Sequence, residues 1–293
     1  MAAVFEFPDL YKEKPVADPV FRVYKEQYSY DKTDLKARVE SRQDSPQGWV
    51  KEKITYDAAY GGERIIAYLF LPKNAAPPYQ IVIYDPSADA LFQRSSQDLE
   101  GWGEFQAFLS FIVKNGRAVL FPVYKGDFER RSDATWAALP GPPDSHQQVE
   151  GVIRHVKDLR RSIDYLETRP DIDHEKLAFY GVSMGAMHGP LIPAVEERLK
   201  VSILIGGCIQ PGMRPEAYEV NYVTRVKIPT LMLNGKYDAI CPMEKTAKPM
   251  FDLLGTPAEH KRLVLYDSDH IPPRNEIIKE TLAWLDRYLG PVK

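Results

Sequence analysis

Short apolar runs alternate with longer amphipathic segments along most of this chain. The runs contain Val, Ile, Leu, Phe, Met and Tyr with few charges, and continuous apolar runs of this length are typical of strands buried on both faces. They lie at 80–84, 117–124, 176–180, 201–205, 230–234 and 262–266.

Helical spacing of apolar residues fills the intervals between these runs. It predicts helices over 102–113 and 149–166, from Ser183 to about Arg198, and over 277–289. Strands that alternate with amphipathic helices favour an α/β fold with a mostly parallel sheet and helices on both faces. An earlier pair, 50–56 and 64–72, reads as an antiparallel hairpin at the sheet edge.

The alternating pattern starts only after the first fifty residues. Residues 1–48 are polar and mixed, so we predict an N-terminal extension packed on a catalytic domain that spans 49–293. Residues 125–148 and 208–227 are too long for plain connections. Both follow strand C-termini, where open α/β sheets bind ligands, and they are expected to form pocket walls or a small cap.

The composition and charge of the chain indicate which kinds of partner it binds and in which cellular compartment it is found. The formal net charge is −3 with 27% charged residues, which gives no electrostatic reason to expect nucleic acid or an anionic membrane as partner. The chain has no apolar run long enough to span a bilayer, and its first residues lack the pattern of a signal peptide. Cys208 and Cys241 are expected to be free, buried thiols, which favours a cytoplasmic protein.

The strongest chemical signal is G-V-S-M-G, with Ser183 at its centre. It follows an apolar strand and enters a helix, the setting of a nucleophile elbow. Side chains at Gly181 or Gly185 would collide with neighbouring backbone at such a turn. The alternative is a glycine-rich turn that packs a helix on a strand.

A serine nucleophile needs a base, and His270 is the candidate because it follows the last strand and can reach back over the sheet. A surface role for His270 is left open. We expect His155 and His174 at the surface and His188 in helix packing, and nothing fixes His146 in the pocket.

The acid that orients the base is predicted to be Asp238, which follows the strand at 230–234. The order Ser183, Asp238, His270 is the order that α/β-hydrolases use. Asp267 and Asp269 are the rivals, but neighbours of His270 on a tight loop rarely aim their side chains at it.

Two backbone N–H groups are needed for the oxyanion. Met184, which follows the nucleophile, should supply one, and Ala88 the other, with Ser87 as runner-up and as a substrate contact. Tyr124 either lines the pocket and binds substrate or anchors the insertion.

These motifs together resemble the α/β-hydrolase superfamily, nearest its acetyl-xylan-esterase and dienelactone-hydrolase-like branch. The segment 119–131, G-V-S-M-G-A, N-G-K-Y-D and S-D-H are similar to hydrolase domains sometimes fused to bacterial serine/threonine kinases. The resemblance implies an α/β-hydrolase fold with Ser183, Asp238 and His270 as its triad. This chain departs from the branch at 86–90, where P-S-A-D-A replaces P-G-S-x-A, and Asp89 makes the pocket mouth less favourable for anions.

The expected activity is that of a serine hydrolase that cleaves short-chain or aryl carboxylic esters through an acyl-enzyme, without metal or organic cofactor. The same triad could act on amide or carbon–carbon bonds or in acyl transfer, and a non-catalytic binding protein on this fold is the third reading. A small-molecule ester is the expected partner, and a homodimer is left open.

Overall fold

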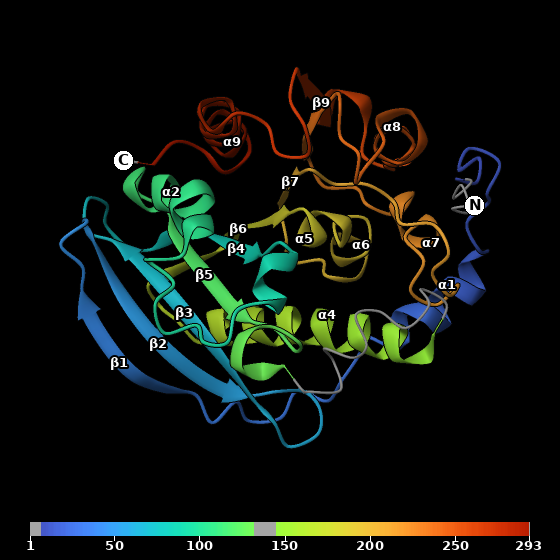
Figure 1. The fold of residues 1–293 in the computed structure, drawn as a ribbon. Coiled ribbons are helices and arrows are strands. Elements are labelled where there is room, and N and C mark those ends of the chain that lie inside the picture. Colours follow the sequence, from blue (N-terminus) through green and yellow to red (C-terminus); the bar gives the residue numbers. More distant parts are fainter. Residues whose placement is uncertain (1–6, 132–144, 293) are drawn as a thin grey trace.

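The computed structural model describes residues 7–131 and 145–292, and these form one nine-stranded sheet flanked by helices (Figure 1). The strand order is β1-β2-β3-β5-β4-β6-β7-β8-β9. The strands are β1 (Arg38–Asp44), β2 (Trp49–Asp57), β3 (Arg64–Pro72), β4 (Tyr79–Asp85), β5 (Ala118–Val123), β6 (Ile172–Val182), β7 (Val201–Ile205), β8 (Thr230–Gly235) and β9 (Lys261–Tyr266).

The sheet is antiparallel at one end and parallel elsewhere. β1, β2 and β3 form an antiparallel meander, and β3 also pairs antiparallel with β5. Every pair from β5 through β4 to β9 is parallel. The carboxyl ends of these parallel strands therefore lie along one edge, where the candidate residues were expected to meet.

The N-terminal boundary differs from the prediction. The break at residue 48 falls between β1 and β2, which pair residue by residue, so the sheet begins at Arg38. The sequence of β1, R-V-E-S-R-Q-D, has no apolar alternation because this edge strand is mostly exposed. Before it, α1 (Asp18–Glu26) packs through Phe21 against Tyr222.

Helices cover both faces of the sheet. On one face α4 (His146–Glu167) packs on β5 and β6, and on the other α9 (Arg274–Leu289) and α2 (Ser110–Lys114) pack on the sheet (Figure 1). The remaining helical segments are η1 (Ala88–Leu91), η2 (Phe105–Leu109), η3 (Phe128–Arg130), α5 (Met184–Met187), α6 (Ile192–Val195), α7 (Val220–Val223), η4 (Met243–Ala247), α8 (Lys248–Leu253) and η5 (Ala258–His260).

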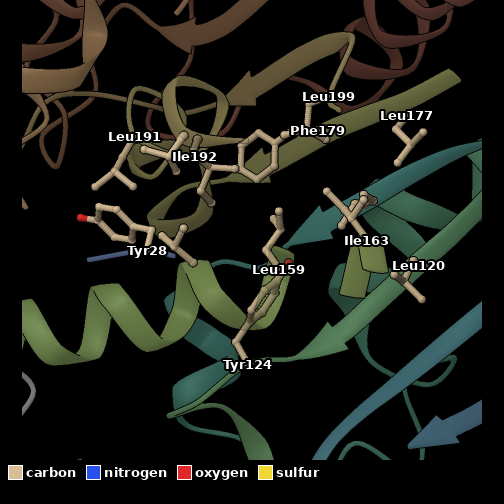
Figure 2. Close-up of a cluster of buried hydrophobic side chains, with 14 of the residues drawn as sticks. Tyr28, Leu120, Tyr124, Leu159, Ile163, Leu177, Phe179, Leu191, Ile192 and Leu199 are labelled. Carbon is tan, nitrogen blue, oxygen red and sulfur yellow. The ribbon is translucent and has the colours of Figure 1, made fainter. Parts of the chain in front are cut away.

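Each face has its own apolar core. Figure 2 shows part of the core beneath α4, where Leu159 and Ile163 of that helix lie against Phe179 of β6 and Leu120 of β5. The core of the other face gathers η2, α2 and α9 over the same strands. Close packing on both faces fixes the positions of the strands, and therefore also those of the side chains that follow the strand ends.

The helix after Ser183 is shorter than predicted. It ends as α5 at Met187, and α6 follows separately. A Cβ on Gly189 would come within 2.5 Å of Leu204, and Pro190 has no N–H to continue the hydrogen-bond ladder. The chain therefore turns at 189–190 instead of extending one helix towards Arg198.

The expectation of free thiols is wrong, because Cys208 and Cys241 form a disulfide. They follow neighbouring parallel strands, β7 and β8, so their loops emerge side by side at the same edge of the sheet. The bond joins the loop after β7 to the loop that carries Asp238.

The two long connections can be followed only in part. Residues 132–144 of the first lie outside the described residues, whereas 208–227 contains α7 and supplies side chains to a cavity beside Ser183. Within residues 7–131 and 145–292, no helix combines the length and the apolar character needed to cross a bilayer.

Candidate active site

Ser183 lies on the sharp turn between β6 and α5 in a backbone conformation that side chains rarely adopt, with φ 52° and ψ −112°. Its neighbours explain the two glycines: a Cβ on Gly181 would lie 2.4 Å from the Gly185 carbonyl oxygen, and one on Gly185 would lie 2.1 Å from the Asp85 carbonyl oxygen. The Ser183 N–H donates to the Ile205 carbonyl of β7 at 2.8 Å. The predicted strained elbow is present, and only glycine fits on either side of it.

A continuous hydrogen-bonded chain joins the three predicted side chains. Ser183 Oγ lies 2.8 Å from His270 Nε2, and His270 Nδ1 lies 2.7 Å from Asp238 Oδ2. They come from the ends of β6, β9 and β8, which are far apart in sequence but share one sheet edge. This is the geometry in which an imidazole can take a proton from a hydroxyl while a carboxylate holds its other nitrogen.

The loop after β8 holds Asp238 in place. Its side chain is fully buried, and Oδ1 accepts the N–H groups of Ile240 and Cys241 at 2.8 Å each. The two rival carboxylates bond to other groups. Asp269 Oδ1 accepts the backbone N–H of His270, and Asp267 pairs with Lys236. Only Asp238 therefore faces the imidazole nitrogen among the three carboxylates.

The two predicted oxyanion donors share one cavity with the nucleophile. Ala88, Met184 and Ser183 all line it, and within the described residues neither the Ala88 nor the Met184 N–H donates to another group. Gly185 N donates to the Pro86 carbonyl and so holds the turn after β4 against the elbow. The Ser87 N–H is already used, because it donates to Glu104 Oε1 at 3.0 Å, which rules out the runner-up as a free donor.

Glu104 is a functional candidate that sequence reasoning missed. Its side chain is buried beside the turn after β4, which carries Ser87 and Ala88, and its Oε2 has no hydrogen-bond partner among the described residues. Burial raises the pKa of Glu104 to about 7, although the Ser87 N–H partly opposes the shift. The residue had no distinguishing signal in the sequence, since it lies in an ordinary helical stretch.

We expect Glu104 to make the stability of the fold depend on pH. Its pKa is higher in the folded state than in the unfolded chain, so between about pH 4.5 and 7 the folded state holds more protons. The free energy of unfolding should therefore fall as pH rises through this window, by on the order of 3 kcal/mol, at ~1.4 kcal/mol per pKa unit. Glu104→Gln should remove this slope in urea denaturation curves recorded from pH 4.5 to 8.

The matched control is Glu259→Gln, which alters an exposed carboxylate. The difference in free energy of unfolding between Glu259→Gln and the wild-type protein should stay constant across the same pH range. If the corresponding difference for Glu104→Gln is also constant, burial does not disfavour the charge of Glu104 and the prediction is wrong.

Two cavities meet at Ser183. The first, about 330 Å³, is mainly apolar and extends past Met184 and Met187 to residues 210–219. The second, about 590 Å³, is lined by His270 and by Trp102, Glu104 and Phe108. Ala88, Ser183 and Ile240 line both cavities, whereas His270 lines only the second.

The prediction that Tyr124 lines the pocket is wrong. Tyr124 is fully buried, its hydroxyl donates to the Tyr84 carbonyl at 2.8 Å, and its ring stacks on His155 with centroids 4.0 Å apart. Its alternative, structural role is the one that the structure shows. Ser87, by contrast, does line the second cavity, and its Oγ accepts the Asp89 N–H.

A second buried carboxylate–imidazole cluster lies behind the elbow. Asp85, at the end of β4, lies 3.0 Å from His155 Nε2 and 3.0 Å from His188 Nδ1. His155 is buried and not at the surface as predicted, because the helical stripe of α4 extends to its position. Burial raises the pKa of Asp85, but the two imidazoles outweigh this and hold it well below its ordinary value.

Two groups of side chains have the types and spacing of metal ligands within the described residues. In one, Asp238, Cys241 and His270, the sulfur is engaged in the disulfide and cannot act as a thiolate. In the other, Asp85, His155 and His188, the nitrogen–oxygen distances are those of hydrogen bonds.

The sequence is similar to known hydrolases over about half of its length. Cutinase 1 of Thermobifida cellulosilytica is 27% identical over 158 residues, which cover 53% of this chain and 55% of the cutinase. The putative hydrolase YtaP of Bacillus subtilis (strain 168) is 23% identical over 169 residues, covering 57% of this chain and 54% of YtaP. The chain thus spans about half the length of the curated relatives it matches.

The fold has solved counterparts. Acetyl xylan esterase 1 from Thermoanaerobacterium sp. JW/SL YS485 superposes with a TM-score of 0.70 at 15% identity, covering 97% of this chain and 100% of that one. This likeness confirms the predicted α/β-hydrolase fold. The narrower resemblance to kinase-fused hydrolase domains stays a prediction, because none of these relatives bears on it.

Family membership rests on the part of the chain that carries the triad. A family model for PET hydrolase-like proteins matches residues 134–291, which is more than half of the chain and includes Ser183, Asp238 and His270. By that match the chain belongs to the PET hydrolase-like family.

Proposed function

We propose that this protein is a serine esterase that cleaves carboxylic esters through an acyl-enzyme on Ser183. The observation that carries the proposal is the hydrogen-bonded chain from Asp238 through His270 to Ser183 Oγ, with links of 2.7 and 2.8 Å. A protein that only bound ligands on this fold would have no need of a base aimed at a serine in a strained turn. The cutinases and acetyl xylan esterases among its relatives add support.

The reaction follows from the geometry. His270 Nε2 takes the proton as Ser183 Oγ bonds to the ester carbonyl carbon, and the carbonyl oxygen becomes an oxyanion facing the Met184 and Ala88 N–H groups. The carbon–oxygen bond to the alcohol then breaks, and His270 returns the proton to the leaving alkoxide. Water repeats the sequence on the acyl-enzyme, releasing the acid and restoring Ser183. Asp238 stabilises the imidazolium at each stage.

The two cavities divide the substrate between them. Because His270 must protonate the leaving group, the alcohol part lies in the cavity that His270 lines, and the acyl part lies in the 330 Å³ cavity. We call the latter the acyl cavity. Its modest size and apolar walls favour a short-chain or aryl acyl group, and Ser87, which lines the other cavity, is proposed to contact the alcohol part.

A panel of p-nitrophenyl esters tests this function. Hydrolysis should be fastest with short acyl chains and with benzoate, and it should fall steeply for decanoate and longer chains that the acyl cavity cannot enclose. The matching p-nitroanilides should react far more slowly. A protein that hydrolyses none of the esters, or that prefers the anilides, would contradict the proposal.

The Cys208–Cys241 disulfide bears on where the protein is found in the cell. Two free thiols would favour the cytoplasm, and the disulfide removes that support, since disulfides persist mainly in oxidising compartments. A cytoplasmic location and a homodimer both stay predictions.

A further inference from the structure

The wall of the acyl cavity is apolar with a few polar positions. Leu91, Phe92, Val152 and Met187 represent the apolar part. The polar residues are Gln148, His188, Gln210 and Glu219, besides Ser183 itself. No Lys or Arg lines the cavity among the described residues, so the formal charge of its wall is negative when Glu219 is ionised.

His188 offers the cavity a hydrogen-bond acceptor. Its Nδ1 lies 3.0 Å from Asp85 Oδ2, and Asp85 is a fully buried carboxylate that two imidazoles keep ionised. A carboxylate only accepts, so the proton of a neutral His188 lies on Nδ1 and its Nε2 is left as an acceptor. Asp85 thus sets the tautomer of a residue on the cavity wall.

Glu219 is the least satisfied polar group of this wall. The residue is only 7% exposed, and its Oε2 makes no hydrogen bond within the described residues. Burial raises the pKa of Glu219 to about 8, although hydrogen bonds from the backbone partly oppose the shift. A bound cation beside this carboxyl group would favour its ionised form.

The amide of Gln210 completes the pattern. Its Nε2 donates to Met187 Sδ at 2.8 Å, which leaves its carbonyl oxygen as an acceptor. Together with His188 and Glu219, it gives the wall three hydrogen-bond acceptors. An anionic acyl group would meet no lysine or arginine among the described residues of this wall, whereas a positively charged donor would pair with the Glu219 carboxylate.

We propose that the acyl cavity is a binding site for an acyl group that carries a primary ammonium, with Glu219 as its ion-pair partner and His188 as a hydrogen-bond acceptor. This inference rests on the proposed esterase function and names a substrate class for it. A neutral hydroxyl would satisfy the acceptors but would leave the buried carboxyl of Glu219 without a counter-charge.

The test compares methyl esters of equal length at pH 8: 6-aminohexanoate, 6-hydroxyhexanoate and heptanoate. For the wild-type protein, kcat/KM for the amino ester should exceed that of heptanoate by about tenfold or more, as expected for a charge-assisted pair. The hydroxy ester should fall between them. Glu219→Gln, which keeps the size and removes the charge, should bring the ratio of amino ester to heptanoate close to one.

The matched control is Glu197→Gln, which alters an exposed carboxylate paired with Lys25 and should retain the wild-type ratio. The comparison of the three esters with the wild-type protein needs no variant, so it tests the ammonium site even where Glu219→Gln fails to fold. A wild-type ratio at or below one, with p-nitrophenyl esters still hydrolysed, would overturn the ammonium site alone. Failure to hydrolyse any ester would instead overturn the esterase function.

Discussion

Ser183→Ala should lower kcat/KM for a p-nitrophenyl ester by at least about 10⁴-fold while the protein stays folded. The loss is large because the variant has no atom that can bond to the carbonyl carbon, and His270 and the two N–H donors act only on that bond. The fold should survive because the one hydrogen bond of Ser183 Oγ that the structure shows is to His270. Alanine also meets the same backbone conformation at φ 52° that serine already tolerates.

Initial rates of p-nitrophenol release, with circular dichroism and thermal unfolding of the same samples, measure both halves of this expectation. Ser95→Ala, at an exposed position, is the control and should leave the rate unchanged. Turnover by Ser183→Ala within tenfold of the wild-type rate would refute the nucleophile.

The second large effect is expected at Asp238. In Asp238→Asn the amide can keep its oxygen on the Ile240 and Cys241 N–H groups, which turns its NH₂ towards His270 Nδ1. The imidazole would then carry its proton on Nε2, facing Ser183, and could not accept the serine proton. A change of tautomer of this kind lowers kcat by on the order of 10⁴-fold in a serine protease, and we expect a loss of 10³- to 10⁴-fold here.

Asp269→Asn is the matched comparison because it alters the neighbour of His270. Asp269 accepts the His270 backbone N–H, a role that an amide oxygen can fill, so the loss should stay within a few-fold. Rates of both variants on one ester, measured from pH 6 to 9, decide between them. A larger loss in Asp269→Asn than in Asp238→Asn would mean that Asp269 orients His270. That result would contradict the hydrogen bond between Asp238 and His270.

The part of the site that could be predicted from sequence is the part that follows strand ends. Ser183, Asp238 and His270 each come directly after an apolar run, and in a parallel sheet the carboxyl ends of such runs meet at one edge. Continuous apolar runs are enough to place β8 and the second half of β6, because both are buried on both faces of the sheet. The strand β1 has no such run and is not predicted, since an exposed edge strand needs no apolar residues in a regular pattern.

Other features depend on contacts that sequence spacing does not carry. Asp85 ends β4, His155 lies in α4 and His188 follows α5, so only the tertiary packing of these three segments brings the side chains together. Glu104 and Glu219 have no local pattern, and their character comes from burial. The disulfide can be predicted only if β7 and β8 are known to be neighbours in the sheet, and the amino-acid composition does not contain that information.

The central claim is that Ser183 is an activated nucleophile, and covalent labelling tests it most directly. The wild-type protein is incubated with a fluorophosphonate at pH 8, its intact mass is measured, and the adduct is located by peptide mapping. The account predicts one adduct, on Ser183, that forms in the wild-type protein and fails to form in Ser183→Ala. An adduct on another residue, or an unmodified Ser183 in a folded sample, would contradict it.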